Sequence, residues 1–194
     1  MWNTPNLLTL LRILLIPVFV GIFYIPAAWG PLVCALVFTI AALTDLLDGY
    51  LARRWRQTSS FGAFLDPVAD KLMVAVALVL LVQSDPRAIL ALPAAIIIGR
   101  EITVSGLREW MAELGARTQV AVSRIAKYKT ATQMVAVILL IAIRDYTESP
   151  PYSLGLVLLY IAAILTLWSM VRYLHVAWPS LTSPHNSPNA KNSL

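Results

Sequence analysis

The stretch Thr44–Lys71, TDLLDGYLARRWRQTSSFGAFLDPVADK, lies between two long apolar runs and carries four carboxylates. These acids are Asp45, Asp48, Asp66 and Asp70. The first two are three residues apart and the last two are four apart, so on helices each pair shares one face. A charged side chain near the centre of a bilayer costs about 3 kcal/mol. Four acids at the ends of apolar runs therefore need compensating partners.

The composition around this stretch is that of a membrane protein. The chain has 194 residues, of which 59% are hydrophobic and 13% charged, whereas a soluble domain is about 45–50% apolar and about 25% charged. Its apolar runs are long and continuous rather than short and alternating, which favours helices over the strands of a barrel. We therefore expect an all-α, polytopic membrane protein with one membrane domain.

Six apolar runs predict six transmembrane helices. Their approximate ranges are 7–25, 32–52, 61–83, 88–110, 127–143 and 152–178. At Asp66-Pro67 the proline predicts either a kink in the third helix or a late helix start. The membrane domain would thus cover residues 1–178, and the tail 179–194, rich in Ser, Pro and Asn, would be disordered.

The basic residues set the expected orientation. Most of them lie in or beside the links between the second and third runs and between the fourth and fifth runs. By the positive-inside rule these links and both termini are cytoplasmic. The net charge of +5 would also suit nucleic acid, but in a membrane protein it indicates cytoplasmic loops beside anionic lipid. We expect membrane lipids and no nucleic acid as partners.

Two carboxylate pairs without a cation inside either pair are typical of a divalent-metal site. Two Mg²⁺ or Mn²⁺ ions would balance four negative charges and suit phosphoryl transfer at a diphosphate. Asp45, Asp48 and Asp66 would be the main ligands, while Asp70 suits either metal ligation or proton transfer. The alternative is a structural network in which the acids bind arginines.

Five basic residues lie in the last part of the fourth run, in the link after it or at the start of the fifth run: Arg100, Arg108, Arg124, Lys127 and Lys129. Each one separately is typical of an interfacial anchor at a helix end. Together they predict a pocket for an anionic, water-soluble substrate, and glycerol 3-phosphate fits such a pocket.

Asn6, Thr9 and Arg12 form a polar stripe at the start of the first run, since they are three residues apart. One interpretation is a helix start whose arginine extends to the lipid head groups. The other is a polar face turned toward the active site.

The central stretch has the spacing D-x2-D-G-x2-A-R-x8-G-x3-D-x3-D, eight fixed positions over 26 residues. This spacing resembles the signature of the CDP-alcohol phosphotransferases, integral membrane enzymes that make phospholipids. The resemblance implies that Asp70 accepts the proton of the attacking hydroxyl. It also implies that Gly49, Ala52 and Gly62 shape a slot for the cytidine of CDP-diacylglycerol, and that Arg53 and Ser59 contact its diphosphate or nucleotide. Small residues there also suit close helix packing.

Three further segments, PNLLTLLR, REITVSGLREWMAELG and VAVSRIAKYKTATQM, are similar to the phosphatidylglycerophosphate synthase members of that family. The resemblance implies that glycerol 3-phosphate is the acceptor, that CMP leaves, and that Asn6 and Thr9 help to hold the nucleotide-lipid head group. It also implies a bacterial inner-membrane location with the active site near the cytoplasmic face, and a homodimer. Inositol phosphate, serine or phosphatidylglycerol as the acceptor stays an alternative. A divalent-cation transporter is a rival of another class, although no inverted repeat is evident.

Overall fold

The computed structural model describes residues 4–55, 60–113 and 124–182. Within these ranges it describes side chains for 7–44, 65, 68–69, 71–107, 109–111, 129–172 and 174–175. Every regular element in them is a helix, which confirms the all-α prediction. The helices are α1 (Thr4–Phe23), α2 (Gly30–Trp55), α3 (Ser60–Ser84), α4 (Ala88–Glu113), α5 (Arg124–Ala142) and α6 (Pro150–Thr182).

Each predicted apolar run corresponds to one of these helices, with ends that differ by a few residues. The α3 helix begins at Ser60 and is continuous through positions 66 and 67, so the late helix start considered at Asp66-Pro67 is not observed. The α6 helix continues to Thr182, four residues past the predicted end of the membrane domain. The rest of the predicted tail, 183–194, lies outside the described residues.

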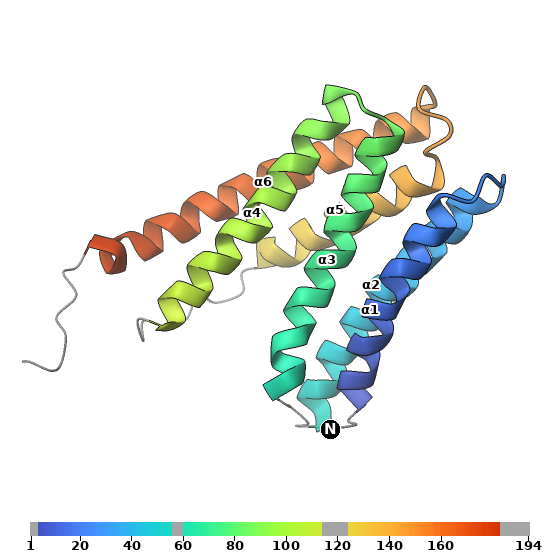
Figure 1. The fold of residues 1–194 in the computed structure, drawn as a ribbon. Helices are drawn as coiled ribbons and strands as arrows, with labels where there is room; N and C mark the ends of the chain where they lie inside the picture. The colour runs from blue at the N-terminus through green and yellow to red at the C-terminus, as the bar shows by residue number, and fades with distance from the viewer. Residues whose placement is uncertain (1–3, 56–59, 114–123, 183–194) are drawn as a thin grey trace, which may run out of the picture.

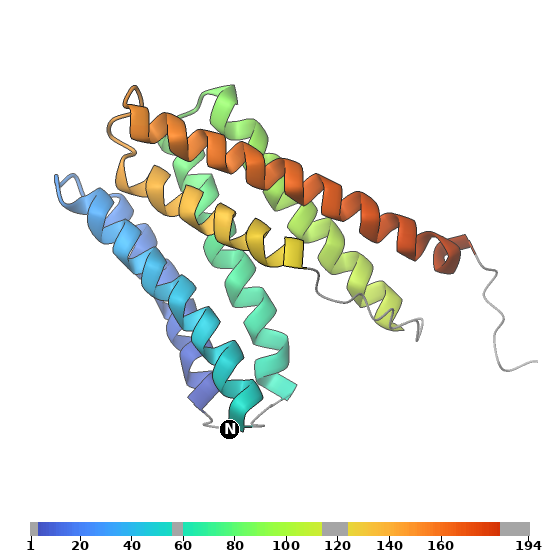
Figure 2. The same ribbon diagram turned by 180° about the vertical axis from the view of Figure 1, so that it is seen from behind.

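The helices alternate in direction, so the short turns 24–29, 85–87 and 143–149 all lie on one side of the bundle (Figure 1). The opposite side holds the start of α1, the end of α2 and the start of α3, together with the end of α4, the start of α5 and the end of α6. We call these the turn side and the motif side. Figure 2 shows α5 and α6 running side by side across the back of the molecule. The α3 helix is central, because it contacts α1, α2, α4 and α5.

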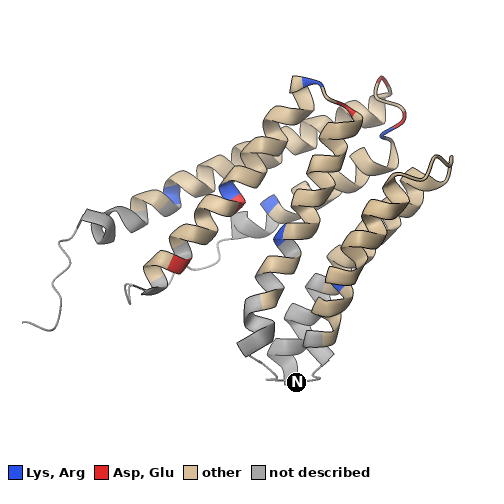
Figure 3. Cartoon of the chain, viewed as in Figure 1, with Lys and Arg blue, Asp and Glu red and all other residues tan. Residues whose placement is uncertain are grey.

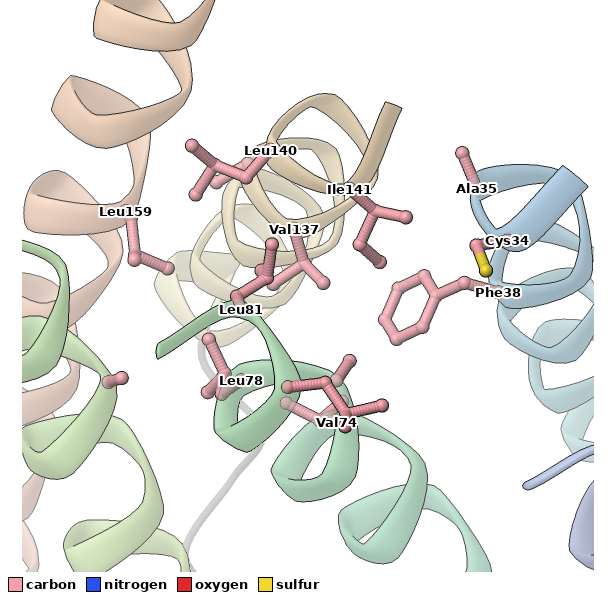
Figure 4. Close-up of a cluster of buried hydrophobic side chains, with 14 of the residues drawn as sticks. Cys34, Ala35, Phe38, Val74, Leu78, Leu81, Val137, Leu140, Ile141 and Leu159 are labelled. Carbon is pink, nitrogen blue, oxygen red and sulfur yellow. The ribbon is translucent and has the colours of Figure 1, made fainter. Parts of the chain in front are cut away.

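The core lies where α2, α3, α5 and α6 meet (Figure 4). Leu78 and Leu81 of α3 face Val137 of α5, and Leu140 lies on the side of α5 that faces α6; all four side chains are fully buried or nearly so. On α6, Gly155 allows close approach to α5, because a Cβ there would lie 2.9 Å from two atoms of the Leu140 side chain. The buried side chains at this junction hold α3 against α5.

A buried carboxylate joins two of the turns on the turn side. Asp85 accepts hydrogen bonds from Arg87 Nε at 2.7 Å and from the Tyr152 hydroxyl at 2.6 Å. Since Tyr152 is on α6, this pair fastens the start of α6 to the α3–α4 turn. The hydrogen bonds from Arg87 outweigh the effect of burial and hold the pKa of Asp85 below its ordinary value.

A second arginine fastens the α5–α6 turn to the end of α1. Arg144 Nη2 donates to the Phe23 carbonyl at 2.9 Å, and its guanidinium lies 3.8 Å from the centre of the Phe23 ring. A cation at the C-terminal end of a helix satisfies a free carbonyl and complements the helix dipole. The turn side is therefore fixed by specific polar contacts.

The surface and helix lengths are compatible with a membrane protein. Among the described residues, Ala88–Met111 and Pro150–Arg172 are long and apolar enough to cross a bilayer, and the described apolar parts of the other helices are shorter. Many large apolar side chains point outward, such as Leu14, Leu32, Leu92 and Ile164. Figure 3 shows few charged positions along the described helices, with most of the ribbon tan. Outward apolar side chains on long helices indicate contact with lipid or with other protein.

Candidate active site

The signature acids belong to two helices that contact each other. Positions 45 and 48 lie in the last part of α2, and positions 66 and 70 lie in the first part of α3. Both pairs are thus helical and belong to the motif side, as the sequence predicts. The side chains of the acids, and of Gly49, Ala52, Arg53 and Gly62, lie outside the described residues, as does Ser59 altogether. Among described side chains there is no group of three metal-ligating residues.

The polar stripe of α1 turns into the bundle. Thr9 is fully buried and Arg12 is 1% exposed. Arg12 lines a small pocket together with Phe38 and Ala41 of α2 and Met73 of α3. This burial excludes the interpretation in which Arg12 extends to the lipid head groups. The side chain of Asn6 lies outside the described residues.

Two of the predicted acceptor-binding cations come together in the structure. Arg100 of α4 and Lys129 of α5 both donate to Oε1 of Glu101, at 2.6 Å and 3.3 Å respectively. Arg100 also donates to the Ser169 hydroxyl of α6 at 3.1 Å. One carboxylate thus gathers cations from two helices, and a third helix orients one of them. The side chains of Arg108, Arg124 and Lys127 lie outside the described residues, on the same ends of α4 and α5.

A further cation approaches the same part of α4 from α3. Lys71 Nζ donates to the Ser105 hydroxyl, which itself donates to the Glu101 carbonyl at 2.5 Å. Lys71 directly follows Asp70 in the sequence. The helix that carries the second acid pair is therefore hydrogen-bonded to the helix that carries Arg100.

Sequence reasoning assigned no role to Glu101, Lys71, Ser105 or Ser169. The signal for Glu101 was its position, because an acid beside an arginine inside an apolar run needs a partner. The hydroxyl partners gave no such signal, since serine is common in membrane helices and bonds its own backbone there. Only the packing of α3, α4, α5 and α6 identifies these residues as neighbours.

Comparison with known proteins finds a family model that matches most of this chain. The family model described as CDP-alcohol phosphatidyltransferase matches residues 2–168. The chain belongs to this family. Because the match covers α1 to most of α6, the acid-bearing helices and the cation pair all lie inside the family domain. CDP-alcohol phosphatidyltransferases generally depend on divalent cations.

Curated relatives are similar over nearly the whole chain. A protein of Pectobacterium atrosepticum is 56% identical over 183 residues, covering 94% of this chain and 99% of the relative. One of Yersinia pestis (strain Pestoides F) is 54% identical and covers 94% and 98%, and one of Sodalis glossinidius is 55% identical and covers 90% and 94%. Each is named CDP-diacylglycerol–glycerol-3-phosphate 3-phosphatidyltransferase.

Proposed function

We propose that this CDP-alcohol phosphatidyltransferase makes phosphatidylglycerophosphate from CDP-diacylglycerol and glycerol 3-phosphate. The observation that carries the proposal is the 56% identity, over 94% of the chain, to a relative named for that reaction. The complete acid signature and the paired cations of α4 and α5 agree with it. A hydroxyl oxygen of glycerol 3-phosphate attacks the phosphorus that bears diacylglycerol, the bond from that phosphorus to the CMP oxygen breaks, and CMP leaves.

The acid pairs suit two divalent ions. Carboxylate oxygens are the ligands that Mg²⁺ and Mn²⁺ prefer, and helical spacing brings each pair to one face of α2 or α3. Asp45, Asp48 and Asp66 would hold the ions, with Asp70 as a further ligand. When bound, the ions supply positive charge that stabilises the diphosphate and the departing CMP.

The remaining signature residues would bind and activate the substrates. Asp70 accepts the proton of the attacking hydroxyl, which raises the nucleophilicity of the oxygen. The groups that would hold the nucleotide-lipid are Asn6, Thr9, Gly49, Ala52, Arg53, Ser59 and Gly62. Since Thr9 is buried on α1, its hydroxyl is directed to the interior of the bundle rather than to lipid.

Arg100 and Lys129 would bind the phosphate of the acceptor. Both are largely buried, and both contact the same carboxylate oxygen of Glu101. A guanidinium and an ammonium side by side match a phosphate monoester, because each supplies charge-assisted hydrogen bonds. Arg108, Arg124 and Lys127 would extend the same positive surface. These cations favour glycerol 3-phosphate over serine, which has no phosphate.

We also propose a bacterial inner-membrane enzyme with six transmembrane helices, both termini in the cytoplasm, and a homodimeric assembly. The start of α1 and the end of α6 both lie on the motif side, which supports this orientation. The basic links of that side favour the cytoplasm, where water-soluble glycerol 3-phosphate is available. The lipid substrate would enter from the bilayer, so the site has to open in two directions.

The test is CMP release by the purified protein in micelles. CDP-diacylglycerol and Mg²⁺ are supplied with glycerol 3-phosphate, inositol phosphate, serine or phosphatidylglycerol in turn. We expect CMP release with glycerol 3-phosphate only, and its absence with that acceptor would refute the proposal.

Asp66→Asn tests the metal assignment in the same assay. This variant should lose at least about 100-fold in kcat while its thermal unfolding stays close to that of the wild type, because the change removes a charged ligand and no packing volume. Asp145→Asn is the matched control, since Asp145 is an exposed carboxylate on the turn side. Full activity of Asp66→Asn would contradict the assignment.

A further inference from the structure

Glu101 lies at the centre of the polar contacts between α4, α5 and α6. Its Oε1 atom accepts from Arg100 Nη1 at 2.6 Å and from Lys129 Nζ at 3.3 Å. The side chains of the two cations are 11% and 7% exposed, whereas that of Glu101 is 27% exposed. The carboxylate therefore lies on the more open side of a largely buried pair of positive charges.

Arg100 is held from a second direction. Its Nη2 donates to Ser169, whose hydroxyl in turn donates to the Thr166 carbonyl at 2.8 Å. Among the described residues its buried Nε atom has no hydrogen-bond partner. The guanidinium is thus held in orientation by Glu101 and Ser169.

Arg100 and Lys129 bring two positive charges to one carboxylate oxygen of Glu101, in a poorly solvated place. Arg100 Nη1 and Lys129 Nζ both lie within 3.3 Å of Glu101 Oε1. Without the carboxylate these two nitrogens would repel each other strongly, because the local dielectric constant is low. Glu101 therefore keeps two like charges close enough to bind the same anion.

We propose that Glu101 is a positioning residue for the acceptor: it holds Arg100 and Lys129 at the separation that a phosphate monoester needs. This inference rests on the proposed function, in which those two cations bind glycerol 3-phosphate. Two cations held side by side favour an acceptor that carries a phosphate over a neutral alcohol. Glu101 acts through the two cations and takes no part in the transfer itself.

The test compares Glu101→Gln with the wild type in CMP release at varied glycerol 3-phosphate. Glutamine keeps the shape and one acceptor oxygen but loses the charge, so the two cations separate and the phosphate has to bring them together. We expect KM for glycerol 3-phosphate to rise on the order of tenfold, while kcat changes by less than about threefold. Glu101→Asp, which keeps the charge, should recover part of this loss. Glu109→Gln is the matched control, because Glu109 is an exposed acid two turns further along α4.

A purely structural role would give a different result. It would reduce the folded, active fraction and therefore kcat, and it would leave KM unchanged; that outcome overturns the proposal. Lys129→Met supplies a second check. Without Lys129 the repulsion between this lysine and Arg100 is gone, so Glu101→Gln should change KM much less in that background. Equal effects in both backgrounds would also overturn the proposal.

Binding measured without turnover separates this inference from the proposed function. Glycerol 3-phosphate should raise the unfolding temperature of the wild type, with a half-maximal concentration that increases in Glu101→Gln and not in Glu109→Gln. If this shift occurs but no CMP is released with glycerol 3-phosphate, the proposed reaction fails and the role of Glu101 stands. If CMP is released and neither KM nor binding depends on Glu101, the positioning role fails alone.

Discussion

Tyr152→Phe tests how the turn side is held together. The substitution removes one hydroxyl and keeps the ring, which is 1% exposed. That hydroxyl donates to a carboxylate oxygen of Asp85 at 2.6 Å, and hydrogen bonds to charged groups contribute about 1.5–3 kcal/mol. Arg87 Nη2 also donates to the same oxygen at 2.9 Å, so Asp85 keeps a partner and the loss falls near the lower end. We expect about 2 kcal/mol of lost stability.

Unfolding can be followed through the single cysteine of the chain. Cys34 is fully buried, so a thiol-reactive fluorophore labels it only as the bundle opens. For a chain of this size about 2 kcal/mol corresponds to a decrease of about 4–8 °C in the unfolding temperature. Tyr146→Phe is the matched control, because the Tyr146 side chain is 70% exposed and its substitution should leave the unfolding temperature unchanged. Activity at 25 °C should not change in either variant.

The pH dependence of the stability difference tests whether the lost hydrogen bond to the Asp85 carboxylate causes it. The pKa of Asp85 is lowered in the folded state, first by the hydrogen bonds from Arg87. The stabilisation from this carboxylate is therefore complete above its unfolded pKa of about 3.9 and is lost as the pH falls through the lower folded value. The difference between wild type and Tyr152→Phe, measured by tryptophan fluorescence, should be constant above about pH 5 and shrink below about pH 4. The reasoning is refuted if the unfolding temperatures of the wild type and Tyr152→Phe differ by less than 1 °C at pH 7, or if their difference is the same at pH 3 as at pH 7.

Two further predictions concern helix packing and orientation. Gly155→Ala should destabilise the bundle by about 1–3 kcal/mol relative to the control Gly21→Ala. A Cβ at position 155 would lie 2.9 Å from two atoms of Leu140, whereas nothing lies within 4 Å of a Cβ at position 21. Equal unfolding temperatures of the two variants would contradict this packing. A reporter fused after Tyr146, in the turn between α5 and α6, should be active only as a periplasmic reporter. Cytoplasmic reporter activity there would refute the proposed orientation.

The sequence predicted the helices well because hydrophobic length is a local property. Each continuous apolar run was long enough to form a helix, and prolines and polar turns separated the runs, as at Ser84-Asp85-Pro86. The start of α3 was less certain, since Pro67 disfavours a helix at the preceding residue and yet the helix continues through it. Sequence spacing alone also placed each acid pair on a single helix.

The contacts between helices could not be predicted from the sequence. Arg12 had two interpretations, and only the packing of α1 against α2 and α3 shows that it is buried. Arg100 and Lys129 were predicted to share a pocket, but their common partner Glu101 follows from the way α4 and α5 meet. Spacing along one helix fixes which residues share its face, whereas the rotation of each helix about its axis depends on all of its neighbours together.

By itself the sequence determined the helical architecture, the acid signature and the family to which this chain belongs, because periodicity and spacing are encoded residue by residue. The tertiary structure decided which side chains meet across helices: Tyr152 with Asp85 on the turn side, and Glu101 between two cations toward the motif side. Tyr152 and Asp85 are 67 residues apart in the sequence, and Lys129 and Glu101 are 28 apart, so no local rule specifies these contacts. They follow from burial of apolar faces, which selects one arrangement of six helices and brings the polar groups together as a consequence.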